Sequence, residues 1–321
     1  MGTLLQDVRY GLRMLRKKPT FTIVVILTLA LGVGANTAIF SIVNAVLLRS
    51  LPFRNPDRLV RIFFNNPGVG VHDVRFSVPE LDDLNTRSGV FEDVSPVANI
   101  SANLTGAKQP ERLEALVTNP NYFSMLRATP QIGRLFGPQD FALGFATAVV
   151  ISDGLWRRSY GADPNVLGRS LRLDNDPYTI VGVLPPGFRH PGPTTGRDVE
   201  VWLTTGFSAD PWPLPPTRAT RFIPGAIGRL KPGLTLEQAQ ARLTAMAIQL
   251  RHDFATDYPP QAQWTVEIQS LQESLVGNVR PMLLVVMGAV ILIVFIVSLN
   301  IANLLLARAS GRQQEMAVRL T

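Results

Sequence analysis

The chain has 321 residues, of which 46% are hydrophobic and only 17% charged, and its net charge is +7. Soluble domains usually contain about 25% charged residues, so this composition excludes general disorder and indicates stretches that do not meet water. The absence of cysteine excludes disulfides, thiolate metal sites and cysteine nucleophiles.

The positive charge is concentrated at the two ends of the chain. Five Lys or Arg residues and one Asp lie in residues 1–18, and three Arg and one Glu lie in residues 308–321, which leaves the rest nearly neutral. A basic excess in short terminal segments is typical of membrane flanks and argues against a nucleic-acid-binding surface.

Two long stretches, residues 19–48 and 281–307, contain no charged residue. Each exceeds the roughly 20 residues that cross a bilayer, so we predict a transmembrane helix in each. The alternatives are a cleaved signal peptide for the first stretch and a buried core helix for the second, and both stretches are too long for them. The basic residues precede the first stretch and follow the second. Because basic flanks stay on the cytoplasmic side of a membrane, both termini are expected in the cytoplasm and residues 49–280 outside it.

Small and polar residues inside these stretches predict a contact between the two helices. Pairs of asparagines lie on one face of each helix and could form hydrogen bonds between helices, although amides tolerated near the membrane interface would give the same pattern. The candidate contact residues are Gly32, Gly34, Asn36, Asn44, Asn300 and Asn303.

The middle segment shows a mixed α/β pattern. Alternating apolar residues predict strands over 58–64, 112–118, 146–152 and 265–271, and residues 171–183 read as a hairpin that turns at 174–176. Capping boxes predict helices that begin after Ser77 and Thr235, the second reaching about residue 251 with an apolar stripe. The stripe consists of Leu236, Ala239, Leu243, Ala247 and Leu250.

Proline-rich and glycine-rich connections at 190–197 and 209–218 divide this segment. We predict a base formed by residues 50–140 and 217–275, with residues 141–216 as an inserted, largely β subdomain. The expected fold class is therefore an α+β membrane protein, in which two transmembrane helices flank a large extracytoplasmic domain.

No set of residues for catalysis is evident. His72, His190 and His252 are isolated in sequence without metal-ligand spacing, and each is expected to be a surface or structural residue. The chain also lacks a nucleophile elbow and a phosphate-binding loop of the Walker type. We therefore predict a protein that is not an enzyme and has no cofactor, which leaves an anchored hydrolase poorly supported.

Residues 308–321 continue a helical pattern after the second stretch. Met316 and Leu320 lie four residues apart on one face, with charged residues on others, which predicts a short amphipathic helix at the membrane surface. A simple stop-transfer flank is the alternative.

Several segments, in order along the chain, carry a resemblance to a known family. The resemblance is carried by five segments. These are the opening DVRYGLRMLRKKPTFTIVVILTLALGVGANTAIFSIVNAVLLRSLPF, the internal NYFSMLRATPQIGRLF, VVISDGLWRRSYGADPNVLGRSLRLDNDPYTIVGVLPPGF and RLKPGLTLEQAQARL, and the final SLNIANLLLARASGRQQEMAVRL. The chain resembles MacB-like and FtsX-like ABC transporter permeases, especially the duplicated orphan permease subfamily.

The resemblance implies a bacterial inner-membrane permease subunit with a porter-like α/β periplasmic domain, which couples ATP hydrolysis by a partner ATPase to periplasmic change and export. Implied partners are the bilayer, a cytoplasmic ABC ATPase, a second permease copy or fused half, and a periplasmic adaptor, with no nucleic acid. The implied coupling residues are Arg308, Arg312, Glu315, Met316 and Arg319.

Family members continue past the position of Thr321 into further spans, so this chain is expected to be a fragment. The alternative function is a membrane-anchored binding or sensor module without an ATPase partner.

Overall fold

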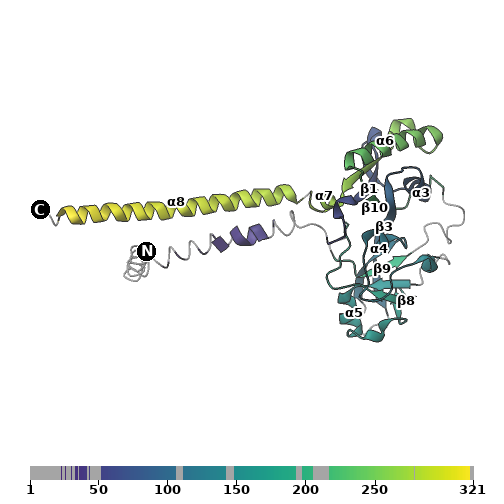
Figure 1. The fold of residues 1–321 in the computed structure, drawn as a ribbon, viewed down its shortest axis with the longest axis horizontal. Helices are drawn as coiled ribbons and strands as arrows, with labels where there is room; N and C mark the ends of the chain where they lie inside the picture. Colours follow the sequence, from purple (N-terminus) through teal and green to yellow (C-terminus); the bar gives the residue numbers. More distant parts are fainter. Residues whose placement is uncertain are drawn as a thin grey trace. The chain divides into compact units, whose positions relative to one another are not determined.

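The computed structural model describes residues 23, 26, 30, 33–34, 36–41, 43, 52–105, 111–141, 148–192, 197–204, 217–277 and 279–318 (Figure 1). The chain divides into a unit of residues 50–275 and a unit of residues 1–49 with 276–321, and each is described by itself. Judged by length and hydropathy together, none of the helices in these described ranges qualifies as a membrane-crossing segment.

The larger unit is built on one mixed sheet of eleven strands within the described residues. The strands are β1 (Leu59–Asn66), β2 (Val71–Val74), β3 (Phe91–Thr105), β4 (Glu111–Thr118), β5 (Ile132–Gly133), β6 (Ala148–Ile151), β7 (Ser170–Leu173), β8 (Asp176–Val183), β9 (Val201–Thr204), β10 (Ala226–Leu230) and β11 (Thr265–Ser270). Their spatial order is β11-β1-β10-β3-β4-β9-β6-β8-β5, while β2 pairs with β1 and β7 pairs with β3 and β8.

The helices are α3 (Val78–Thr86), α4 (Tyr122–Leu126), α5 (Asp153–Tyr160), α6 (Leu236–Asp253), α7 (Leu271–Val276) and α8 (Arg280–Val318). Short 3₁₀ turns occur at η2 (Pro56–Arg58), η3 (Pro67–Val69), η4 (Pro138–Phe141), η5 (Pro164–Val166) and η6 (Pro260–Ala262).

The long strand β3 divides the sheet into two lobes. Its first part, up to Pro96, pairs with β10, and the part from Val97 onward pairs with β4. We call β1, β2, β10, β11 and the start of β3, with α3 and α6, the first lobe. The second lobe is the end of β3 with strands β4 to β9 and helix α5.

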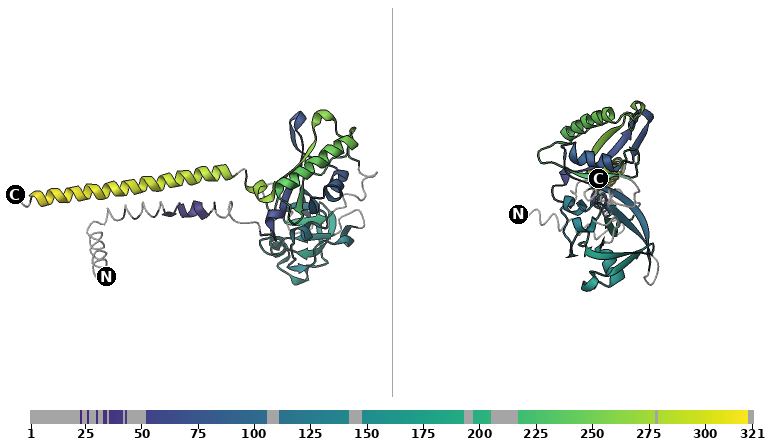
Figure 2. Two further views of the ribbon diagram at one scale, coloured as in Figure 1. Left: turned by 45° about the horizontal axis from the view of Figure 1, so that its top comes forward. Right: turned by 90° about the vertical axis from the view of Figure 1, so that its right-hand side faces the viewer.

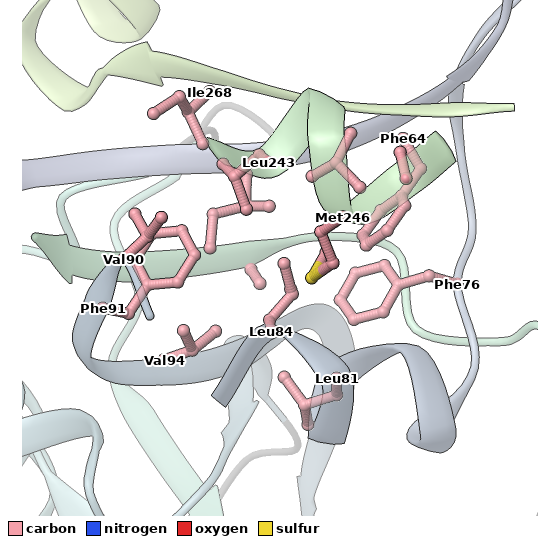
Figure 3. Close-up of a cluster of buried hydrophobic side chains, with 14 of the residues drawn as sticks. Phe64, Phe76, Leu81, Leu84, Val90, Phe91, Val94, Leu243, Met246 and Ile268 are labelled. Atoms are coloured by element: carbon pink, nitrogen blue, oxygen red, sulfur yellow. The ribbon is translucent and has the colours of Figure 1, made fainter. Parts of the chain in front are cut away.

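Each lobe has its own hydrophobic core, and a third cluster joins them. In the first lobe α3 and α6 pack on the strands, and Figure 3 shows Leu84 of α3 and Met246 of α6 pointing toward one another. The third cluster contains residues of both lobes, including Leu59 of β1 and Trp202 of β9. Because this shared core excludes water, the two lobes form one folded body rather than two independent domains.

The predicted local structures are confirmed by the elements observed. Strands β1, β4, β6 and β11 lie within one or two residues of their predicted ranges, and β7 and β8 form the predicted hairpin. Asp174 and Asn175 both have positive φ angles, 50° and 78°, which a two-residue turn of type I′ requires. Both capping boxes are present, at Ser77 with Glu80 and at Thr235 with Gln238.

Helix α6 also protects the edge of the sheet, and Figure 2 shows it beside β11. The Gln240 side chain donates to the carbonyl oxygen of Val266 at 2.9 Å and accepts from the amide of Ile268 at 3.0 Å. Its carboxamide therefore satisfies strand groups that would otherwise be open to another chain. Of the predicted stripe, Leu236 is exposed whereas the other four residues are buried.

In the smaller unit, α8 is one helix of 39 residues. It continues through Arg308, so the predicted coupling segment is not a separate short helix within the described residues. No proline interrupts residues 308–318, and alanine, arginine and glutamine there favour helix continuation.

Candidate functional site

The structure describes only part of the predicted contact and coupling residues. Arg308, Arg312, Glu315 and Met316 lie on α8, as do Asn300 and Asn303, but the placement of their side chains is not described. Arg319, Gly32 and Asn44 lie outside the described residues. Asn36 is exposed, and a Cβ at Gly34 would meet nothing within 4 Å. The helix contact and the coupling roles therefore stay predictions.

The chain enters and leaves the larger unit at the same end of the sheet. Strand β1 begins directly after the first connection and pairs antiparallel with β11, the last strand, so that Val60 lies opposite Ser270. Leu59 lies opposite Arg229 of β10. We call this region, residues 55–60, 229–230 and 270–271, the sheet-end junction.

Leu59 and Leu271 anchor the sheet-end junction in the core. Both side chains are 0% exposed, and both belong to the hydrophobic cluster shared by the two lobes. The two connections are thus fixed to the part of the domain where the lobes meet.

An arginine is buried in the sheet-end junction. Arg229 is 1% exposed; its Nε donates to the carbonyl oxygen of Met125 at 2.7 Å and its Nη1 to that of Asn55 at 3.2 Å, while Nη2 has no hydrogen-bond partner. Burial, together with the positive charges of Arg127 and Arg58, lowers the pKa of Arg229. The carbonyls at the C-terminus of α4 carry partial negative charge, which favours a cation there.

Two more arginines share one carboxylate beside Arg229. Arg58 donates from Nε to the carbonyl oxygen of Leu230 at 2.8 Å and forms an ion pair with Glu92. Arg127 approaches the same carboxylate at 3.5 Å. The hydrogen bond from Arg58 lowers the pKa of Glu92.

A second ionic network, which is buried, lies in the first lobe between α3, residues 217–221 and Tyr258. The side chain of Glu80 is 0% exposed and accepts from the backbone amide of Ser77, from Tyr258 and from Arg221. Asp83, on the same helix, pairs with Arg218 at 2.6 Å and Arg87 at 3.0 Å. The network ties residues 217–221, which follow a long connection, to α3 and to the end of α6.

A buried tyrosine–histidine pair lies between the lobes. The Tyr122 hydroxyl and Nδ1 of His190 are 2.7 Å apart, and Nε2 of His190 has no partner. If Nδ1 carried the proton, both the tyrosine proton and Nε2 would be unpaired, so Tyr122 is expected to donate to Nδ1. A Cβ on Gly192 would lie 2.3 Å from Nε2, so only glycine fits against this ring edge.

Burial lowers the pKa of His190 to about 3, so the ring is neutral at neutral pH. An open cavity of about 200 Å³ lies beside it, with walls from both lobes and α7. It is lined by Arg61, Val97, Asn99, His190, Pro224, Gly225, Ala226, Ile227 and Leu271. In the described part of the chain no three His, Asp or Glu side chains group as a metal site requires.

Sequence reasoning missed the charged residues that meet in the fold. Arg229 lies within a strand that is buried at every position, and the only signal was a charge inside the short apolar run AIGRL. His190 was expected to be a surface or structural residue, and its burial against Tyr122 could not be inferred from its neighbours in sequence.

The larger unit is an α/β domain. The connections that precede β1 and follow β11 lie at one end of its sheet, so the domain is joined to the rest of the chain at that end. A family model for the MacB-like periplasmic core domain matches residues 22–246. The chain belongs to this family, which places it among MacB-like ABC transporter permeases with an extracytoplasmic domain. The permease-type domain of this family is non-catalytic.

Individual relatives agree with this family. The macrolide export ATP-binding/permease protein MacB of Burkholderia thailandensis is 26% identical over 190 residues, which are 59% of this chain and 26% of that protein. This chain thus matches about a quarter of its relative's length.

Solved structures give lower similarity. The extracellular domain of the transporter YknZ from Gram-positive bacteria has a TM-score of 0.47 at 16% identity, covering 66% of this chain and 99% of that chain. The periplasmic region of MacB from Actinobacillus actinomycetemcomitans has a TM-score of 0.48 at 14% identity, covering 70% and 92%.

Proposed function

We propose that the chain is a membrane-anchored permease subunit that couples ATP hydrolysis by a cytoplasmic ABC ATPase to conformational change and export on the periplasmic side. The observation that carries this proposal is the pairing of β1 with β11 at the sheet-end junction. Antiparallel partners such as Val60 and Ser270 have Cα atoms about 4.5–5.5 Å apart, so the connections to residues 19–48 and 281–307 leave the domain together. Movement of either helix would act on the same sheet end.

The two proposed spans rest on sequence and exposure. Residues 19–48 and 281–307 are uncharged. In α8 the exposed large apolar side chains include Met282, Val285, Ile291, Phe295 and Leu299. A long helix that exposes apolar residues from Met282 to Leu299 needs a partner surface there, and the lipid bilayer is the partner we propose.

Orientation follows from the basic flanks. With both termini in the cytoplasm, residues 50–275 are periplasmic and the protein lies in a bacterial inner membrane. Reporter fusions test this: a periplasm-dependent reporter fused after residue 150 is expected to be active, and one fused at Thr321 inactive. The opposite pattern would overturn the orientation.

Coupling is proposed through the end of α8 and the residues that follow it. A cytoplasmic ATPase, a second permease copy or fused half, and a periplasmic adaptor are the proposed partners. The name of the Burkholderia relative combines ATP-binding and permease functions in one protein, which supports an ATPase as the partner activity.

Charge reversal in this segment is expected to abolish coupling. In Glu315→Lys and Arg319→Glu variants, the co-purifying ATPase should lose its stimulation by the permease, because the reversed charges would repel the oppositely charged ATPase groups that we propose they contact. ATP hydrolysis in proteoliposomes measures this, and Gln314→Lys is the matched control on a neighbouring face. Full stimulation in both reversal variants, or recovery of envelope proteins without any ATPase, would contradict the proposal and favour a sensor module.

A further inference from the structure

Arginines within and next to the sheet-end junction form a cluster with too few acidic partners. Arg58 and Arg127 share Glu92, while Arg229 contacts backbone carbonyl oxygens and leaves Nη2 unpaired. Arg54 is exposed beside Asn55, and in the described residues it has no ion pair.

The neighbouring acids do not neutralise this cluster. Asp93 acts on Arg229 only at a distance and accepts from Asn121 at 3.4 Å, and Asp57 is exposed. Among the described residues, Glu92 is therefore the one carboxylate in contact with these guanidinium groups. A buried cation without a contacting anion is unfavourable, and an added anion at the rim would offset it.

The backbone of Arg127 adopts an uncommon conformation. Its φ angle is 56°, in the left-handed region, at the residue that caps the C-terminus of α4. Glycine or asparagine is usual at such a position, and another residue there costs about 1 kcal/mol. Arg127 bears this cost, and its guanidinium group lies 3.5 Å from the Glu92 carboxylate.

We propose that Arg54, Arg58 and Arg127, backed by Arg229, bind the phosphate of an anionic phospholipid headgroup. The inference rests on the proposed function, because it needs residues 19–48 to span the bilayer. Arg54 follows Leu48 by six residues, which reach at most about 21 Å, so with residues 19–48 in the bilayer the chain length allows Arg54 to reach the headgroups. Guanidinium groups bind phosphate in bidentate geometry, which suits this anion.

The test uses the full chain in nanodiscs of phosphatidylcholine alone or with increasing phosphatidylglycerol. Hydrogen exchange of the amides in residues 54–60 and 125–130 is expected to slow as phosphatidylglycerol is added. In the Arg54→Gln and Arg127→Gly variants, the phosphatidylglycerol content that produces half of this protection is expected to rise about fivefold for each arginine removed. Arg242→Gln, an exposed charge removal on α6, is the matched control and should titrate like the native chain.

The outcomes separate this inference from the proposed function. Equal exchange with and without phosphatidylglycerol would overturn the lipid site, and so would an unchanged titration in both arginine variants. Equal protection by inorganic phosphate in phosphatidylcholine discs would assign the site to free phosphate and overturn the lipid source. If carbonate releases the same protein from membranes, residues 19–48 and 281–307 do not span the bilayer, and both the proposed function and the lipid site are refuted. If the chain stays in the membrane but phosphatidylglycerol has no effect, the lipid site alone is refuted.

Discussion

Replacing Glu80 with alanine is expected to lower the free energy of unfolding by about 3–5 kcal/mol. The side chain of Glu80 is 0% exposed, and its removal leaves Arg221, Tyr258 and the backbone amide of Ser77 without their shared acceptor. Glu80→Gln keeps an acceptor but removes the charge, so a smaller loss of about 1.5–3 kcal/mol is expected. Denaturant unfolding of the chain in detergent, followed by tryptophan fluorescence, measures both.

The local geometry provides a reporter and a control for this prediction. The rings of Trp264 and Tyr258 lie 4.4 Å apart, so Trp264 senses loss of the network. Glu237→Ala removes an exposed carboxylate in the first turn of α6 and is expected to change stability by less than about 1 kcal/mol. A Glu80→Ala variant as stable as Glu237→Ala would contradict the structural role assigned to the network.

The elements that sequence reasoning predicted correctly are those whose signals are local. Alternating apolar residues marked β1 and β11, and the reciprocal boxes at Ser77 and Thr235 marked the helix starts, because each signal needs only neighbouring residues. The turn of the β7–β8 hairpin was evident for the same reason, since Asp and Asn accept positive φ angles.

The long strand β3 was not predictable because its stability comes from distant partners. Residues 91–105 include Pro96 and several small polar residues, which disfavour a central strand on propensity alone. Pro96 lies where the pairing passes from β10 to β4, and the two strands together support the full length. Only the tertiary structure shows that β4, from the predicted base, pairs with β9, from the predicted insertion.

The candidate site shows the same limit. Arg229 meets Met125 and Asn55, which are 104 and 174 residues away in sequence. Basic flanks and uncharged stretches could be read directly, because membrane insertion depends on composition over a window. A cluster of arginines assembled from η2, α4 and β10 depends on strand order, which no local pattern encodes.

The stability of the domain is expected to fall at acidic pH because of His190. Burial lowers its pKa in the folded state to about 3, whereas an unfolded chain has a histidine pKa of about 6.5. As the pH falls below about 6.5, the unfolded state gains a proton that the folded state does not, so stability decreases by about 1.4 kcal/mol per pH unit until about pH 3. Above about pH 7 this contribution vanishes.

His190→Asn isolates this contribution, because asparagine can still accept a hydrogen bond from Tyr122 but does not titrate. Carboxylates elsewhere act equally in both proteins, so the difference between their unfolding free energies is expected to change by about 3 kcal/mol between pH 7 and pH 4.5, in favour of the variant. His252→Asn, where the side chain is 91% exposed, is the matched control and should follow the native protein. Parallel pH profiles for the native protein and His190→Asn would show that the imidazole is protonated within the fold, and the buried neutral pair with Tyr122 would have to be abandoned.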